Sequence, residues 1–173
     1  ISTLNQVQLY YASAFSNKIN FVITEIYLTN DSLSENWLKD STTDYRLGRF
    51  RTWAEGGGLN PGYDVATAWS YEHIPGDFLG RAQLGGICSP RAYNVCIAPS
   101  NNVNIQAHEI GHNFGAFHDG KPGMMNGVYL GFGQLVWSDI SIETINKTLS
   151  SATCLQECVL EPPISNFETK NLF

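Results

Sequence analysis

One short stretch of the sequence has the residue types and spacing of a metal site. His108, His112 and His118 occur in the pattern H-E-x-x-H-x-x-G-x-x-H, and Glu109 directly follows the first histidine. On a helix, His108 and His112 would lie one turn apart on the same face, with about 5–6 Å between their Cβ atoms. Two imidazoles in that arrangement bind one zinc ion well. The spacing therefore predicts zinc as a cofactor, with His108 and His112 as ligands.

The rest of the pattern predicts a catalytic rather than a structural zinc site. Gly115 lets the chain leave the helix through a positive φ, which would bring His118 back as the third ligand. Three protein ligands leave the fourth position of a tetrahedral zinc to water. Glu109 is poorly placed to be a ligand but can reach that water, so we expect it to be the general base. His73, the remaining histidine, has no such context, and we expect it to be a loop or structural residue.

The elements that position these residues follow from hydrophobic periodicity. Apolar residues at helical spacing predict an amphipathic helix from Leu4 to Phe15, ended by Asn17 and Lys18. Further helices are expected over residues 44–54, 102–114 and 142–149, the first of them stopped by the glycines at 56–58. Segments rich in β-branched and aromatic residues predict strands at 19–29, 65–70 and 94–98. A turn at residues 75–77 then leads into an extended, glycine-dotted segment from 78 to 88.

Length, composition and charge limit the classes of protein to which this chain can belong. With 173 residues, of which 43% are hydrophobic, the chain is long enough for one domain with an ordinary core. We place that domain at residues 1–161 and a tail at 162–173. The net charge is −6 and the Lys and Arg residues are mostly scattered singly, so we expect no nucleic-acid partner. No run of 18 apolar residues is present, so no membrane span is expected either. We expect a monomer.

Four cysteines, Cys88, Cys96, Cys154 and Cys158, leave the disulfide pattern open. None of them forms a C-x-x-C pair, which argues against a redox motif. We favour two disulfides in an exported protein over free buried thiols. Three pairings are compatible with four cysteines. We lean towards the two local ones, Cys88–Cys96 and Cys154–Cys158, although spacing alone does not decide between them.

The extended histidine motif resembles that of the metzincin zinc peptidases. Asn113 and Asp119, which follow the second and third histidines, resemble the adamalysin (reprolysin) branch of that family. The resemblance implies an α/β (α+β) catalytic domain, with a twisted mixed sheet, an antiparallel substrate-binding edge strand, an active-site helix and a small irregular C-terminal subdomain. It also implies that Asp119 fixes the chain around His118.

Other segments extend this resemblance along the chain. The residues 84–88 are similar to the branch's substrate-side edge strand, which runs into a cysteine. Residues 63–66 resemble its His-Asp-x-Ala strand, with Tyr63 in place of the histidine, and residues 19–31 resemble its second strand. An extended peptide would add to the sheet edge there and bind through its main chain. The expected substrate-binding residues are Gly80, Arg81, Ala82, Gln83, Leu84, Gly85 and Gly86.

The family resemblance also implies a methionine turn beneath the zinc. Aligning on the usual apolar-Met pair makes Met125 the turn residue, with Met124 as the alternative. Tyr129 is too far from Met125 to act as a tyrosine ligand. The residues from 126 to 136 should wall the main specificity pocket, and their apolar content suggests a hydrophobic substrate side chain. The resemblance also allows a calcium ion, for which Asp31, Asp64 or Asp77 could supply oxygen ligands.

The sequence therefore favours a secreted, extracellular zinc endopeptidase that acts on protein or peptide substrates. A catalytically silent binding module and a zinc hydrolase of non-peptide substrates are the alternatives, and the intact glutamate and histidines argue against the first of them. Domains of this branch begin with a strand, whereas Ile1 already stands at the start of a helix. We therefore expect more chain before Ile1, with that strand placed between those at 19–29 and 65–70 and preceded by an inhibitory propeptide.

Overall fold

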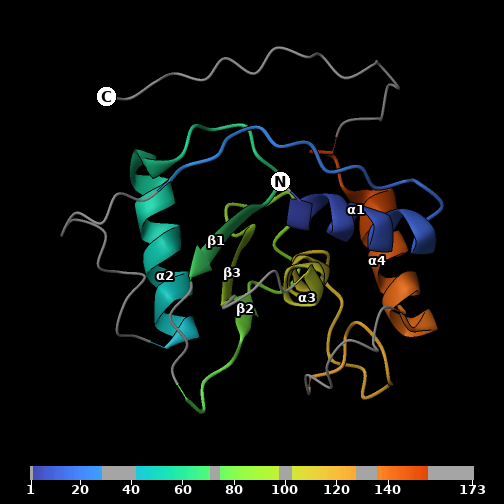
Figure 1. Cartoon of the computed structure of the whole chain (residues 1–173). Coiled ribbons are helices and arrows are strands. Elements are labelled where there is room, and N and C mark those ends of the chain that lie inside the picture. The colour runs from blue at the N-terminus through green and yellow to red at the C-terminus, as the bar shows by residue number, and fades with distance from the viewer. Residues whose placement is uncertain (1, 29–41, 71–74, 98–102, 128–135, 156–173) are drawn as a thin grey trace.

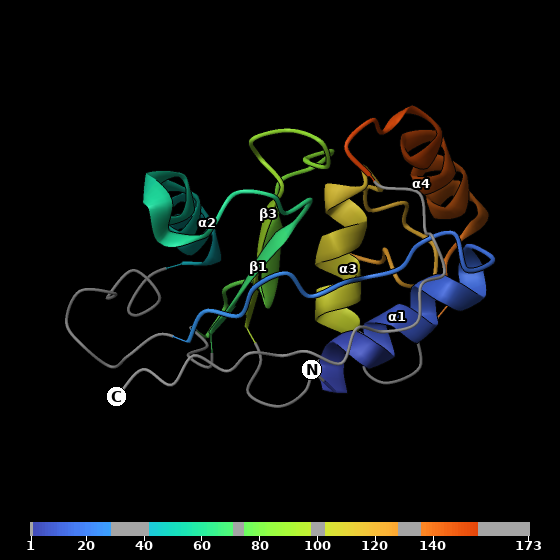
Figure 2. The same ribbon diagram turned by 90° about the horizontal axis from the view of Figure 1, so that it is seen from above.

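The computed structural model describes residues 2–28, 42–70, 75–97, 103–127 and 136–155. Its elements stack in layers around a small sheet (Figure 1). Helix α2 (Thr43–Trp53) covers one face of the sheet and helix α3 (Val103–Asn113) the other, while α1 (Ser2–Ala14) and α4 (Asp139–Ser151) lie beyond α3. Figure 2 shows this order from above. This arrangement is the mixed α/β fold expected for a metzincin catalytic domain.

The sheet has the order β1-β3-β2. The central strand, β3 (Tyr93–Ile97), pairs in parallel with β1 (Ala66–Ser70) and antiparallel with β2 (Gly80–Ala82). Every residue of β3 is buried, because a central strand covered by helices on both faces has no solvent-exposed side. The short antiparallel strand β2 therefore forms one edge of the sheet, as the family resemblance implied. It covers residues 80–82, however, and the residues 84–88 that resembled the edge strand form no strand.

Two hydrophobic cores hold the layers together. The larger one joins α1, α3 and α4, and it includes Tyr11, Phe15 and Trp137, whose rings pack against one another. The Tyr11 hydroxyl also donates to the carbonyl of Ala107, at 2.9 Å, so the first helix is bonded directly to α3. The smaller core lies between α2 and the other face of the sheet, where Phe50 packs edge-on against Tyr93. Helix α3 is thus supported from the sheet and from α1.

Capping residues explain where two of the helices begin. Helix α4 starts at Asp139, earlier than its apolar pattern indicates, because the Ser138 side chain accepts from the Ser141 amide at 3.1 Å. Thr42 caps α2 in the same way, at 3.4 Å from the amide of Tyr45. Helix α1 ends as predicted, since Asn17 has a φ of 59°. Asparagine tolerates this left-handed conformation better than most residues.

The strand predicted at 19–29 is wrong as far as the structure describes that segment. Residues 19–28 have no sheet assignment, and a side chain of α1 holds them instead. Gln8 donates to the carbonyl of Ile19 at 2.8 Å and accepts from the amide of Phe21 at 2.7 Å. The Phe21 ring lies edge-on to that of Tyr11. A strand-like composition becomes a strand only beside a sheet edge that pairs with it, and the segment therefore does not pair with β1.

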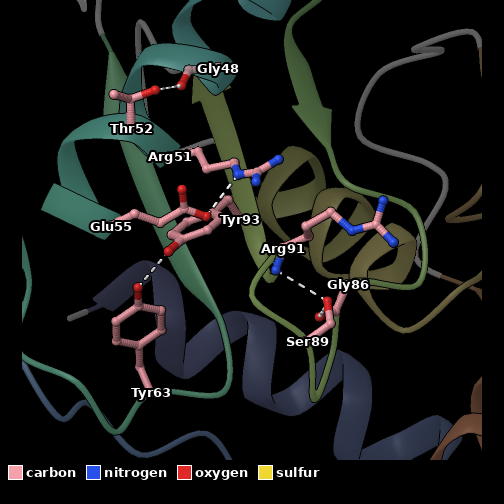
Figure 3. A network of polar contacts seen from close by, with 9 residues as sticks. All are labelled: Gly48, Arg51, Thr52, Glu55, Tyr63, Gly86, Ser89, Arg91 and Tyr93. Carbon is pink, nitrogen blue, oxygen red and sulfur yellow. Dashed lines mark hydrogen bonds and ion pairs between the residues drawn. The ribbon is translucent and has the colours of Figure 1, made fainter.

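The glycines after α2 do not stop the helix at once, as the sequence had suggested. The chain continues through a π-helical turn, η2 (Ala54–Gly58), in which Gly57 has a φ of 97°. Figure 3 shows the ion pair between Arg51 and Glu55, 2.8 Å long, across this junction. The same view shows the hydroxyl of Tyr63, at the position of the family's histidine, 2.7 Å from the hydroxyl of Tyr93. The pair anchors the segment before β1 to the central strand.

The expected local disulfides are also wrong. Cys88 is bonded to Cys154, 66 residues away, and Cys96 is a buried free thiol. Cys96 belongs to the central strand β3 and is fully buried there. Cys88 instead lies in the turn that follows the edge strand, where the end of α4 reaches it. Because Cys154 is already paired, it is not bonded to Cys158.

Several expectations concern residues outside the described ranges. These are His73, Asp31, Tyr129, Cys158, the tail at 162–173 and most of the pocket wall, at residues 128–135. Within the described ranges, no helix is both long and apolar enough to cross a membrane.

Candidate metal centre

Three imidazole rings converge at one point beside the sheet. Two of them, His108 and His112, come from α3, and His118 comes from the segment that follows it. The Nε2 atoms of His108 and His112 each lie 3.1 Å from the Nε2 atom of His118. Within the described residues, these three side chains form the one cluster of His, Cys, Asp and Glu able to hold a metal. The structure thus brings together all three histidines that the spacing selected.

Backbone carbonyls fix the tautomers of the two helical histidines. The Nδ1 atom of His108 lies 2.6 Å from the carbonyl oxygen of Met124, and that of His112 lies 2.6 Å from the carbonyl oxygen of Ala116. A carbonyl oxygen only accepts, so both Nδ1 atoms carry the proton and both Nε2 atoms keep a lone pair. Those lone pairs face the common centre. Neutral imidazoles oriented by a second hydrogen bond are the ligands that zinc takes, so the residues fit zinc.

Burial keeps the His108 and His112 rings uncharged at neutral pH. Burial lowers the pKa of His108 to about 4 and outweighs the hydrogen bond to Met124, which acts in the opposite direction. Burial is also the main cause that lowers the pKa of His112 to about 4, and the neighbouring His108 adds to it. A ring that does not bind a proton keeps its nitrogen available for a metal. The site is therefore prepared for a cation.

Glycines shape the path of the chain around the three rings. Gly115 has a φ of 94°, as predicted, and its amide bonds to the carbonyl of His112 at 2.8 Å. This left-handed residue turns the chain sharply at the end of α3, since glycine adopts such a φ without steric cost. Gly127 approaches the third ring from the other side, where a Cβ would lie 2.7 Å from the Nδ1 atom of His118.

The two adjacent methionines have different places under the site. Both side chains are buried. The sulfur of Met125 lies against Gly111, between the two helical histidines in sequence, and a Cβ at Gly111 would come within 2.7 Å of it. Met124 instead holds His108 through its carbonyl oxygen and lines the cavity. This packing favours Met125, rather than Met124, as the residue beneath the rings.

Glu109 stands beside the histidines with its side chain almost fully buried, at 4% exposure. Its carboxylate packs against Gly80 of the edge strand. Burial raises the pKa of Glu109 to about 8, against the opposing effect of the positive Arg81. Its Oε2 atom has no hydrogen-bond partner among the described residues. A buried acidic group without a partner, with a raised pKa and beside a cavity, is a candidate functional residue.

A cavity of about 760 Å³ opens beside these groups. The three histidines and Glu109 line it, together with α2 residues and the expected substrate-binding residues from 80 to 84. Gly85 and Gly86 do not line it. The strand ends at Ala82, and Gly85 turns back to bond the carbonyl of His112 at 2.8 Å. Of the expected pocket wall, Asn126 and Gly127 line the cavity.

Asp119 ties the third histidine's segment to α4. It accepts hydrogen bonds from the hydroxyl groups of Ser138 and Ser141 and from the amide of Lys121. Although partial burial raises its pKa, these bonds together lower the pKa of Asp119 below its usual value. The carboxylate therefore stays charged and holds the start of α4. The sequence singled out Asp119 but not Ser138, whose position as the residue before a helix was the available signal.

Asn113 is a second residue whose role the sequence did not reveal. Its buried side chain donates to the carbonyls of Gln83 and Tyr93, both at 3.0 Å, and accepts from the side chain of Asn94 at 2.7 Å. It therefore joins the end of α3 to the edge strand and to the central strand. In the sequence, its position directly after His112 contributed to the family resemblance but did not indicate these hydrogen bonds.

The amino-acid sequence matches the family model of metallo-peptidase family M12 over residues 1–153. The chain belongs to metallopeptidase family M12. The sequence resemblance to reprolysin-like metzincins is thereby confirmed. Family membership implies zinc, and in this M12 chain the three histidines are the group that could hold it.

Several animal proteins are similar to this M12 chain. Mouse and human "A disintegrin and metalloproteinase with thrombospondin motifs 16" are each 28% identical in an alignment 188 residues long, gaps included, which covers 94% of the chain and 15% of those proteins. Human "A disintegrin and metalloproteinase with thrombospondin motifs 13" is 36% identical over 96 residues, which cover 49% of the chain and 6% of that protein. The M12 chain thus spans about 15% of the length of the first of these relatives.

The expected calcium ligands find little support in the described part of this M12 domain. Asp77 accepts from the amide of Thr43 at 2.7 Å and also contacts its hydroxyl group, so its carboxylate caps α2. Asp64 belongs to no cluster of potential metal ligands among the described residues. A calcium site remains a prediction.

Proposed function

We propose that this chain is a zinc-dependent endopeptidase that hydrolyses peptide bonds of protein substrates. The observation that carries the proposal is the convergence of three imidazole Nε2 atoms beside one buried carboxylate, in a cavity next to a sheet edge. Zinc bound by His108, His112 and His118 would polarise the scissile carbonyl and lower the pKa of a water molecule.

Glu109 supplies the proton transfers of the proposed reaction. Bound zinc would favour the ionised form of this buried carboxyl group, and the carboxylate then takes a proton from the attacking water as the new C–O bond forms. It then delivers that proton to the leaving amine as the C–N bond breaks. No covalent acyl-enzyme is required. Met125 supports the rings from below, and Asp119 holds the segment of the third ligand.

The edge strand β2 provides the surface on which the substrate would lie. Among the described residues it pairs with β3 on one side only, so its outer edge can take an additional strand. An extended peptide bonded there would pass directly over Glu109 and the histidines, since residues 80–84 line the same cavity. Main-chain bonds would give affinity, and side chains along the cavity would give preference.

The remaining parts of the proposal concern the setting of the domain. A disulfide between Cys88 and Cys154 supports an extracellular location, because such bonds persist in oxidising compartments. We include a monomeric catalytic domain at residues 1–161 and a tail at 162–173. The intact glutamate and histidines support an enzyme over a binding module that no longer cleaves.

A peptide library tests this function directly. The zinc-loaded chain should cleave extended peptides, a chelator should abolish cleavage, and added zinc should restore it. Glu109→Ala should keep its zinc and its fold but lose roughly 10²–10⁴-fold in turnover. The exposed Glu143 of α4 provides the matched control, Glu143→Ala. Full activity in Glu109→Ala would refute the mechanism, and loss of zinc would show that Glu109 is a ligand.

A further inference from the structure

Arg81 places a fixed positive charge on the strand where the substrate is proposed to bind. It is the middle residue of β2, and among the described residues it is the one Lys or Arg that lines the cavity. Its charge is close enough to act on Glu109. The side chain is accessible, with 45% of its surface exposed.

The alternation of side chains along β2 determines the direction of Arg81. Gly80 faces α3, where the Glu109 carboxylate packs against it. Because successive residues of a strand point to opposite faces, Arg81 points away from α3 and towards α2. There its Nε atom bonds to the Oδ1 atom of Asp44 at 2.6 Å. The guanidinium therefore lies on the α2 side of the cavity.

Two neighbours hold the guanidinium in place while leaving part of it available. Asp44 accepts from Nε of Arg81, and its backbone position is held by the preceding residue, Thr43, which is bonded to Asp77. The Arg81 guanidinium also lies over the Phe78 ring, 5.5 Å from its centroid. Only Nε of Arg81 has a hydrogen-bond partner among the described residues. A guanidinium carries five N–H donors, so the edge formed by the two Nη atoms remains for a ligand.

We propose that Arg81 determines specificity by binding an acidic side chain of the peptide substrate. The inference rests on the proposed endopeptidase function and names a substrate class for it. Residues directly opposite each other in paired strands project to the same face. A substrate residue opposite Arg81 therefore points to the α2 side of the cavity. An Asp or Glu there meets the free Nη edge, which suits a carboxylate geometrically.

Asp44 has two opposing effects in this arrangement. It orients the guanidinium through its bond to Nε, and its negative charge repels an incoming carboxylate. Asp44→Asn keeps an oxygen acceptor for Nε and removes the charge. The variant should therefore bind acidic side chains more favourably than the parent does. If a basic substrate side chain instead paired with Asp44, the same change would weaken binding.

The test uses peptides that differ only by Glu, Gln or Lys at one position, scanned along the cleaved sequence. At one position, the parent should prefer Glu over Gln by roughly fivefold in kcat/KM, as expected for a partly exposed charged pair. Arg81→Gln should remove this preference, Arg81→Glu should reverse it towards Lys, and Asp44→Asn should increase it. The matched control is Arg49→Gln, an exposed arginine of α2 outside the cavity, which should keep the parent's preference.

Binding to the uncleaving Glu109→Ala variant separates this inference from the proposed function. Fluorescence anisotropy of the labelled Glu, Gln and Lys peptides should give affinities in the same order as the cleavage preference. Added salt should reduce the difference in affinity between the Glu and Gln peptides. If the parent cleaves no peptide, the proposed endopeptidase function is wrong, while the anisotropy still measures the charge preference. If Arg81→Gln leaves the Glu-to-Gln ratios of cleavage and binding unchanged, or if Lys is preferred, the role of Arg81 is wrong.

Discussion

The carboxylate of Glu109 packs directly against the α-carbon of Gly80. A Cβ at Gly80 would meet the Oε1 atom of Glu109 and would lie only 2.7 Å from its Cδ and Cγ atoms. The proposed general base and the proposed substrate strand are thus in contact through a residue without a side chain. The position of one limits the position of the other.

Gly80→Ala should therefore impair catalysis without removing the metal. The backbone of Gly80 is not in the left-handed region, so alanine is tolerated there and its methyl group displaces the carboxylate. A displacement of about 1 Å is expected to cost on the order of 10²-fold in kcat. Zinc content should stay stoichiometric. Gly48→Ala is the control, because a Cβ there meets nothing within 4 Å and alanine favours a helix. Unchanged turnover in Gly80→Ala would contradict this contact.

His118→Ala should weaken zinc binding because two imidazoles remain of three. The affinity should fall by more than the roughly 10–100-fold that follows loss of a supporting hydrogen bond. Competition with a zinc-binding dye measures it. His73→Ala, which changes the one histidine outside the motif, should keep the parent's affinity. Tight, stoichiometric zinc in His118→Ala would show that this residue is not a ligand.

Asn113→Ala should destabilise the domain by roughly 2–4 kcal/mol in urea unfolding. The fully buried amide donates to the carbonyls of Gln83 and Tyr93 and accepts from the side chain of Asn94. The Tyr93 carbonyl also accepts from the backbone amide of Gln83 at 3.1 Å, so the change removes these bonds from the Gln83 carbonyl and the Asn94 side chain without replacing them. Each polar group left without a partner inside the protein costs about 1–3 kcal/mol. Asn113→Asp should be at least as damaging, because a carboxylate would face two carbonyl oxygens. A loss of unfolding free energy below 0.5 kcal/mol, which is typical of surface changes, would mean that the hydrogen bonds of Asn113 do not stabilise the domain.

The cysteine pattern gives a covalent prediction. Non-reducing peptide mapping should recover Cys88 joined to Cys154. Native Cys96 should resist alkylation, because burial raises the pKa of its thiol well above the usual value, and it should react after unfolding. The paired change of Cys88 and Cys154 to Ser should cost about 4 kcal/mol, as expected for a loop of this length. A peptide joining Cys88 to Cys96 would contradict the structure.

The metal site could be predicted from the sequence because its information is local. His108 and His112 lie one helical turn apart, and Gly115 supplies the turn that returns His118. Helix geometry relates such residues whatever the rest of the chain does. The local pattern of residue types also located α3 and the strands near residues 66–70 and 93–97. The antiparallel edge strand was implied by the family resemblance, and the structure places it at residues 80–82.

Contacts between segments that are far apart in the chain could not be predicted from local sequence patterns. Residues 19–28 have the composition of a strand, yet Gln8 holds them apart from the sheet in the described structure. Cys88 and Cys96 are near neighbours in sequence, yet one leaves the edge strand for α4 and the other lies in the core. The strand was predicted from composition without knowing what the segment packs against, and the disulfides were assigned to near neighbours although Cys88 has a partner 66 residues away.

The sequence by itself determined the family, the three histidines and the glutamate beside them, since these depend on residue type and spacing within one helix and one turn. Only the tertiary structure decided that Glu109 rests on Gly80, that Asn113 joins the helix to the substrate strand, and that Arg81 points towards Asp44. Those relations depend on how a helix packs against a sheet edge. Packing is set by contacts between segments far apart in the chain, which no local pattern records.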